Sequence, residues 1–300
     1  MEKSQSSDGI CQISTSDLKA EEEKIFTSGL IIPFLLAGAY VVYLVYLCNG
    51  LYQLADTVDP FKTTWWSGPI FFTILYLVVV FGGQHLMKSR PEFKIKPYIF
   101  TYNLYQCVLN VWCFYAFVHE FWTNPIFTRF WGNDHVPGRP SFRIGLLIWI
   151  HYNNKFVELL DTLWMILRKK NNQVSFLHCY HHVLLIWAWF LVCKVDTGGD
   201  VFFGASVNSF IHVIMYGYYT MALLNIPCPW KQWITSMQLM QFALCFTHSC
   251  YALYVKKAPA LLAWSQLFVM INMLVLFGNF YLKTYGDKSK RKEGSGKKKQ

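Results

Sequence analysis

The chain has 300 residues, of which 54% are hydrophobic and 18% aromatic, and its formal net charge is +10. Its mean hydropathy is +0.27, and long apolar stretches recur along most of its length, which is typical of a polytopic membrane protein and not of a soluble domain. The basic residues are dispersed over short loops and one low-complexity tail, so no nucleic-acid partner is indicated. The nine cysteines form no CxxC pair, which argues against a disulfide framework and against a zinc ribbon.

Eight apolar stretches, each close to the ~20 residues that cross hydrocarbon, predict an all-α fold embedded in membrane lipid. The first stretch begins too late and is too long for a secretory signal, so we expect it to be retained as an extra N-terminal helix. The chain then divides into an acidic cytosolic segment (1–28), this helix and its loop (29–64), a membrane domain (65–285) and a basic tail (286–300). In chain order the predicted helices are Leu30–Tyr52, Trp65–Met87, Tyr98–Val118, Phe142–Leu167, Val174–Val192, Val201–Leu224, Trp233–Tyr254 and Leu261–Tyr281.

The orientation in the membrane follows from the Lys and Arg residues of the loops. With a cytosolic amino terminus, the cytosolic loops and the tail hold more than twice as many of them as the opposite loops, as the positive-inside rule favours. The carboxyl terminus is then cytosolic, and it ends in KKKQ, with Lys297 and Lys298 at the spacing of a dilysine retrieval signal. We therefore expect a multi-pass protein of the endoplasmic reticulum membrane.

Three histidines mark the first candidate site. The stretch HCYHH places His178, His181 and His182 within an apolar run, and residues at i, i+3 and i+4 share one face of a helix, so we expect the three imidazoles to converge on one point. Ionisable groups at membrane depth are costly and usually face a bundle interior that uses them. The stretch therefore predicts a functional site.

Polar stripes at helical spacing follow three other predicted helices. Each such residue taken singly could be an interhelical hydrogen bond, and Lys155, Glu158 and Asp161 could form a purely structural ion network. Together with the histidines, however, the stripes indicate one shared polar interior. Their members are His151, Asn154, Lys155, Glu158, Asp161 and Thr162 on the fourth helix, Asn208, His212, Tyr216 and Tyr219 on the sixth, and Thr235, Gln238, Gln241, Cys245 and His248 on the seventh.

Several chemistries suit these residues. Membrane di-iron desaturases and hydroxylases carry HxxHH boxes, but they need about eight histidines in three boxes, and one box cannot hold two irons. A neutral imidazole can instead act as nucleophile or general base, oriented by carboxylates such as Glu158 and Asp161. A lipid transporter is a third alternative, because intramembrane His, Glu and Lys also mark transport paths.

Five motifs in order resemble the signature boxes of the very-long-chain fatty acid elongases, which are membrane-bound 3-ketoacyl-CoA synthases. The resemblance runs from about Trp65 to Tyr285, and in detail it is closest to algal elongases that extend twenty-carbon, Δ5-unsaturated acyl chains. Gln173, five residues before His178, is similar to the Gln of the polyunsaturated-type members. The motifs are KFVELLDT (155–162), FLHCYHH (176–182), HVIMYGYY (212–219), TSMQLMQ (235–241) and FGNFY (277–281).

The resemblance implies a seven-helix core, in which six helices surround an acyl tunnel, and the condensation of an acyl-CoA with malonyl-CoA without a metal or redox cofactor. It implies that His181 attacks the thioester, that His182 and His212 act as general base and oxyanion stabiliser, and that Asn208 donates a hydrogen bond. His178, Lys155, Glu158 and Asp161 complete the expected catalytic set, in which the two carboxylates orient imidazoles. Expected substrate contacts are Tyr216, Tyr219, Gln238 and Gln241, with Arg168, Lys169 and Lys170 near the CoA phosphates.

The same resemblance implies functional partners. These would be the ketoacyl-CoA reductase, the dehydratase and the enoyl reductase that complete an elongation cycle. The sequence leaves the oligomeric state open, a homodimer included.

Overall fold

The computed structural model describes residues 26–54, 60–136 and 139–286, and these residues contain helices, turns and loops but no strand. All eight predicted helices are present, which confirms the all-α prediction. The first is α2 (Ile31–Leu54), and the second runs through α3 (Ser67–Val78), a π-helical turn (Val79–Gly83) and α4 (Gln84–Met87). The others are α5 (Lys96–Thr123), α6 (Arg139–Val157) with α7 (Leu160–Leu167), α8 (Phe176–Val195), α9 (Val201–Leu223), α10 (Ile234–Val255) and α11 (Ala260–Tyr281). Of the four predicted segments, 1–28 and 286–300 lie almost wholly outside the described residues.

Five helices of the described chain are long and apolar enough to cross a membrane, so the protein is a polytopic membrane protein. They are Phe26–Gly50, Ser67–Met87, Phe176–Val195, Val201–Leu223 and Ala260–Thr284. The predicted spans at α5, α6–α7 and α10 are less apolar because they carry the buried polar residues described below. Their role as spans stays a prediction.

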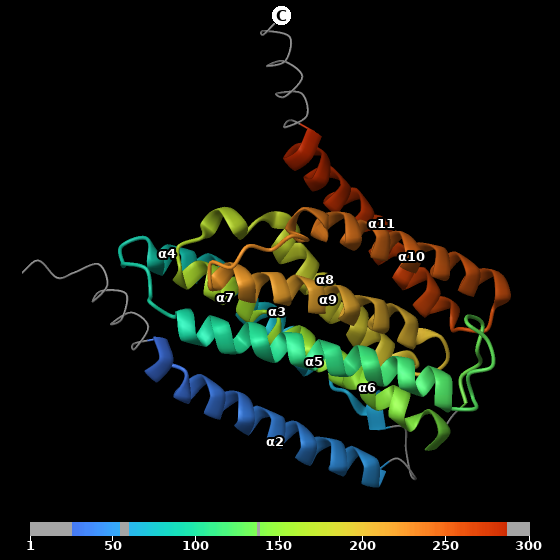
Figure 1. Cartoon of the computed structure of the whole chain (residues 1–300). Helices are drawn as coiled ribbons and strands as arrows, with labels where there is room; N and C mark the ends of the chain where they lie inside the picture. Colours follow the sequence, from blue (N-terminus) through green and yellow to red (C-terminus); the bar gives the residue numbers. More distant parts are fainter. Residues whose placement is uncertain (1–25, 55–59, 137–138, 287–300) are drawn as a thin grey trace, which may run out of the picture.

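Six helices contact one another in a closed cycle, in the order α5, α6, α8, α11, α10, α9 and back to α5. Figure 1 shows α5 alongside α9, and α10 and α11 side by side. The helix α3 contacts α8 from outside the cycle, and α2 packs against α5, where the Tyr40 and Tyr105 rings lie 6.0 Å apart. This arrangement agrees with the six-helix core and one extra N-terminal helix predicted from the sequence.

One helix predicted as continuous is broken. The stretch Phe142–Leu167 contains the separate helices α6 and α7, with a turn at Glu158 and Leu159. At this turn the backbone tightens, since the N–H of Leu159 donates to the carbonyl of Phe156 and that of Asp161 to the carbonyl of Glu158, three residues back in each case. The break lies within the polar stripe, so it changes the directions in which the two carboxylates point.

Two loops close one end of the helix cycle through buried carboxylates. Asp200 accepts hydrogen bonds from the backbone N–H groups of Gly132 and Asn133, and its Oδ2 lies 3.7 Å from His248 Nε2. Burial raises the pKa of Asp200, but the neighbouring His248 side chain and the hydrogen bonds from Gly132 and Asn133 outweigh it and hold the pKa below its usual value. Asp196, at the end of α8, pairs with His135 Nδ1 at 2.7 Å. The loops 124–136 and 196–200 are thereby joined over this end.

Candidate active site

The HCYHH box occupies the first two turns of α8. Ser175 is the N-cap residue, and its side-chain oxygen accepts from the backbone N–H of His178 at 3.2 Å, so the helix begins at Phe176 and not at Val174 as predicted. The His182 ring lies between the other two, with centroids 4.5 Å from His178 and 5.4 Å from His181. The predicted cluster is therefore present, although its members have different partners and do not aim at one point. In the described chain no group of three His, Cys, Asp or Glu side chains could hold a metal ion.

His178 is held by a short hydrogen-bonded chain. Its Nε2 lies 2.8 Å from the Thr162 hydroxyl on α7, and that hydroxyl lies 2.9 Å from the Tyr76 hydroxyl on α3. The Tyr76 ring also contacts the ring of His182, at 6.2 Å between centroids. The helix of Tyr76 shows no polar stripe, so residue spacing alone does not predict this link to His178.

A buried ion pair lies at the centre of the site. Lys155 Nζ is 2.7 Å from Glu158 Oε1, and both side chains are at most 2% exposed. The same Oε1 lies 3.5 Å from His212 Nε2. His212 Nδ1 lies 2.9 Å from the backbone carbonyl oxygen of Asn208, which can only accept, so Nδ1 is assigned as protonated and donates this hydrogen bond. The other ring nitrogen, Nε2, faces the Glu158 carboxylate. The predicted proximity of Lys155, Glu158 and His212 is thus present in the structure.

Asn208 is oriented by the same ion pair. Its Oδ1 accepts a hydrogen bond from Lys155 Nζ at 3.0 Å. Because a lysine can only donate, the amide atom that faces Lys155 must be the oxygen. Its Nδ2–H groups therefore lie on the side of the carboxamide away from Lys155 Nζ. Asn208 also lines the cavity described below.

A polar network on α5 was missed by the sequence reasoning. Gln106 is fully buried, and its Oε1 accepts from Asn154 at 2.8 Å, while the Asn154 amide also donates to Glu158 at 3.1 Å. Asn110 donates to the same Gln106 oxygen at 3.4 Å, and Gln106 Nε2 donates to the Tyr102 hydroxyl at 3.5 Å. The signal was present, since residues 102, 106 and 110 are spaced by four and share one helix face.

The other predicted carboxylate has a tyrosine partner. Tyr216 donates to Asp161 Oδ2 at 2.8 Å, and the Tyr216 hydroxyl lies 3.3 Å from that of Tyr102. The Tyr219 ring packs edge-on against Tyr216, at 5.7 Å between centroids. Asp161 is therefore joined to α9 and α5, while Glu158 faces the histidine side of the site.

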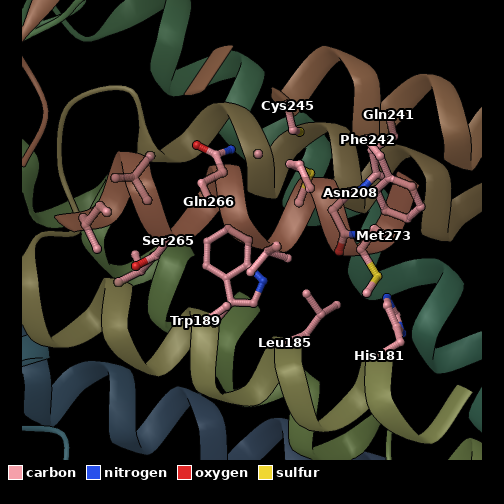
Figure 2. A pocket seen from close by; sticks show the side chains of 17 residues that line it. His181, Leu185, Trp189, Asn208, Gln241, Phe242, Cys245, Ser265, Gln266 and Met273 are labelled. Carbon is pink, nitrogen blue, oxygen red and sulfur yellow. The ribbon is translucent and has the colours of Figure 1, made fainter. Parts of the chain in front are cut away.

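A cavity of about 100 Å³ opens between α8, α9, α10 and α11. Figure 2 shows His181, Asn208 and Met273 near one another at one end of it. Of the three histidines in the box, only His181 lines this cavity, and Gln241 lines it from α10. From His181 the lining follows α8 to Val192, eleven residues on, which corresponds to a length of roughly 16 Å. Most of that wall is apolar, so the cavity is a narrow, mainly hydrophobic passage with an imidazole at one end.

Other predicted contact residues lie away from the cavity wall. Gln238 donates to the Met215 sulfur at 3.8 Å, and Gln173 is exposed in a short 3₁₀ turn before α8. The basic residues Arg168, Lys169 and Lys170 follow the end of α7, with Lys169 and Lys170 exposed. They stand close in the chain to the start of α8, which carries the histidines.

Comparisons with known proteins identify related sequences. The model of the ELO family, described as the GNS1/SUR4 family, matches residues 60–293. Very long chain fatty acid elongase 5 of Xenopus tropicalis is 37% identical over 230 residues, which cover 75% of this chain and 78% of that protein. Very long chain fatty acid elongase 4 of Macaca mulatta is 35% identical over 261 residues, covering 80% and 83%, and its human counterpart is 34% identical with the same coverage. The family match begins after α2 and includes every residue of the site.

Proposed function

This chain belongs to the ELO (GNS1/SUR4) family, and from that premise we propose that it is the condensing enzyme of fatty acid elongation. It joins an acyl-CoA to malonyl-CoA and releases carbon dioxide, free CoA and a 3-oxoacyl-CoA that is two carbons longer. The observation that carries the proposal is the cavity, which offers a nucleophile at one end and an apolar wall along its length. An acyl chain fits such a wall, because burial of its methylenes is favourable.

In the first half-reaction, the imidazole of His181 attacks the thioester carbonyl carbon. A carbon–nitrogen bond forms, the carbon–sulfur bond breaks, and CoA leaves as its thiol with the proton released by the imidazole. The acyl-imidazole is reactive toward water, so the chemistry needs a dry cavity. The acyl tail itself fills the passage beyond His181 and excludes water.

In the second half-reaction, malonyl-CoA loses carbon dioxide, and the electron pair of the broken carbon–carbon bond forms an enolate. The enolate carbon attacks the acyl carbon, the carbon–nitrogen bond breaks, and the departing His181 imidazole takes up one proton that solvent supplies through His182 or His212. The Nδ2–H groups of Asn208 stand at the cavity wall as donors for the developing oxyanion. No metal or redox cofactor is needed in either step.

The buried ion network supports these groups. Lys155 fixes the Asn208 carboxamide, and Glu158 faces His212. His182 contacts both His178 and His181, and it acts with His212 in proton transfer and oxyanion stabilisation. Asp161, Tyr216 and Tyr219 secure the α7–α9 contact beside the site, and Gln241 borders the reacting groups.

The basic loop after α7 suits the polar end of the substrate. Arg168, Lys169 and Lys170 supply positive charge for the CoA phosphates, on the face from which α8 begins. We place this face in the cytosol and the protein in the endoplasmic reticulum membrane. The 3-oxo product then requires reduction, dehydration and a second reduction, which are the reactions of the expected partner enzymes.

A reconstituted assay tests the condensation. We expect the purified protein to incorporate labelled malonyl-CoA into longer 3-oxoacyl-CoA, to release one carbon dioxide per turnover, and to keep this activity in strong chelators. Within a panel of acyl-CoAs, we expect arachidonoyl and eicosapentaenoyl chains to be extended to twenty-two carbons in preference to palmitoyl. Oxygen- and iron-dependent product would contradict the proposal in favour of an oxygenase, and binding without turnover would favour a transporter. A preference for palmitoyl would reject only the polyunsaturated specificity.

Topology gives a separate prediction. The tail lies outside the described residues, so the prediction rests on the sequence. In sealed microsomes, protease should remove an epitope placed after Gln300, whereas an epitope at the exposed turn Lys256–Lys257, on the opposite side in the predicted topology, should be protected. Changing Lys297 and Lys298 to Ser should let a fraction of the protein leave the endoplasmic reticulum, and changing Lys290 and Lys292 in the same way is the matched control. Protection of the tail would overturn the topology.

A further inference from the structure

A second polar group lines the cavity away from the histidine. Gln266, on α11, faces Gly204 of α9, and a methyl group built on Gly204 would lie 3.2 Å from the Gln266 side-chain nitrogen. The glycine therefore lets the carboxamide pack closely against α9. Figure 2 shows the Gln266 side chain well apart from His181, above the ring of Trp189. Gln266 makes no hydrogen bond within the described part of the chain, although it lies among apolar residues such as Leu262 and Val269.

The depth of this carboxamide follows from helix geometry. Gly204 precedes Asn208 by four residues and Gln266 precedes Met273 by seven, so the carboxamide lies roughly 6 to 10 Å beyond the histidine end. An extended carbon chain, with bonds of about 1.5 Å and angles near 111°, advances about 1.25 Å per carbon. A chain attached at His181 would therefore bring roughly its fifth to ninth carbons past Gln266.

An unpartnered amide N–H in an apolar passage favours ligands that offer it electron density. A saturated chain covers the N–H with methylenes and leaves it unsatisfied, which is unfavourable. A carbon–carbon double bond presents a π face, to which an N–H can form a weak hydrogen bond. A cis double bond also bends the chain, whereas the gap at Gly204 is taken up by the carboxamide nitrogen itself.

We propose that Gln266, set against Gly204, is a specificity-determining residue that favours acyl chains with a cis double bond between about the fifth and ninth carbons. This inference rests on the proposed elongase function, and it specifies where in the acyl chain a double bond favours elongation. Weak contacts of this kind change affinity about two- to fivefold, and we expect a preference of that size in kcat/KM.

The test uses twenty-carbon acyl-CoAs that contain a single cis double bond at carbon 5, 8, 11 or 14. The unmodified enzyme should extend the 5- and 8-isomers about two- to fivefold more efficiently than the 14-isomer. Gln266→Met keeps the length of the side chain and removes the N–H, so it should bring the ratio near one. Phe268→Leu, at an exposed residue of the same helix that does not line the cavity, is the matched control and should keep the ratio.

The outcomes distinguish the role of Gln266 from the proposed elongase function. Elongation of all isomers at equal rates by the unmodified enzyme would overturn the role of Gln266 and leave the elongase function intact, even if Gln266→Met does not fold. An unchanged ratio in Gln266→Met would overturn the role as well. Absence of any elongation would instead contradict the proposed function.

Discussion

Replacement of His181 by Ala should abolish acyl transfer while the protein still folds. We expect the release of CoA from acyl-CoA, measured without malonyl-CoA, to fall on the order of a thousandfold or more, because the nucleophile of the proposed mechanism is lost. The size of the effect follows from the position of His181, the one member of the HCYHH box that lines the cavity. Burst kinetics with a thiol reagent measure this half-reaction directly.

A matched control separates chemistry from folding. His119 is exposed and distant in sequence from the site, so His119→Ala should keep the activity and the thermal stability. Mass spectrometry of the enzyme after incubation with acyl-CoA should find the acyl group on His181 in the unmodified protein. Near-normal CoA release by His181→Ala, or acylation of another residue, would show that the nucleophile is assigned wrongly.

Lys155→Met should reduce both stability and activity, because it leaves Glu158 as a buried charge without its partner. Removing one member of a buried ion pair costs about 3–5 kcal/mol, which should lower the midpoint of thermal unfolding by roughly 10 °C. The Asn208 carboxamide also loses the donor that orients it. We therefore expect kcat to fall about a hundredfold or more, as for the loss of a preorganised oxyanion donor.

The double variant Lys155→Met with Glu158→Gln distinguishes a catalytic from a structural role. It removes both charges, so much of the lost stability should return, whereas the activity should not. Recovery of both would show that the pair is only structural. The control is Lys257→Gln, which breaks the 2.7 Å pair with Asp134, where both side chains are exposed (43% and 61%); such pairs contribute little. Circular dichroism on heating and steady-state kinetics supply the two readouts.

Local patterns in the sequence were sufficient to predict the helices and the residues that face inward. Hydropathy over about twenty residues marks a membrane helix, and spacing by three and four marks a face, so both can be read without knowing the neighbours. These patterns predicted the eight helices and the buried Lys155, Glu158 and His212. They also carried the resemblance to the elongases, which the family match confirms.

The partners of those residues depend on how the helices rotate and pack, which local spacing does not determine. Glu158 and Asp161 are three residues apart, yet the helix break between α6 and α7 sends one toward His212 and the other toward Tyr216. Within the histidine box, packing of α8 against α11 and α7 places His181 in the cavity and joins His178 to Thr162.

The roles of some residues follow only from contacts between helices that are far apart in the sequence. Gln106 lies 48 residues from Asn154 in the chain, and its role follows from the packing of α5 against α6. In the sequence, nothing distinguishes Gln266 from other polar residues of a membrane helix. Its contact with Gly204 depends on the packing of α11 near α9. The sequence by itself therefore determined many of the buried polar side chains of α6, α8, α9 and α10, because burial follows local periodicity. Only the tertiary structure decided which of them share a hydrogen bond or a cavity, because those contacts join helices far apart in the chain.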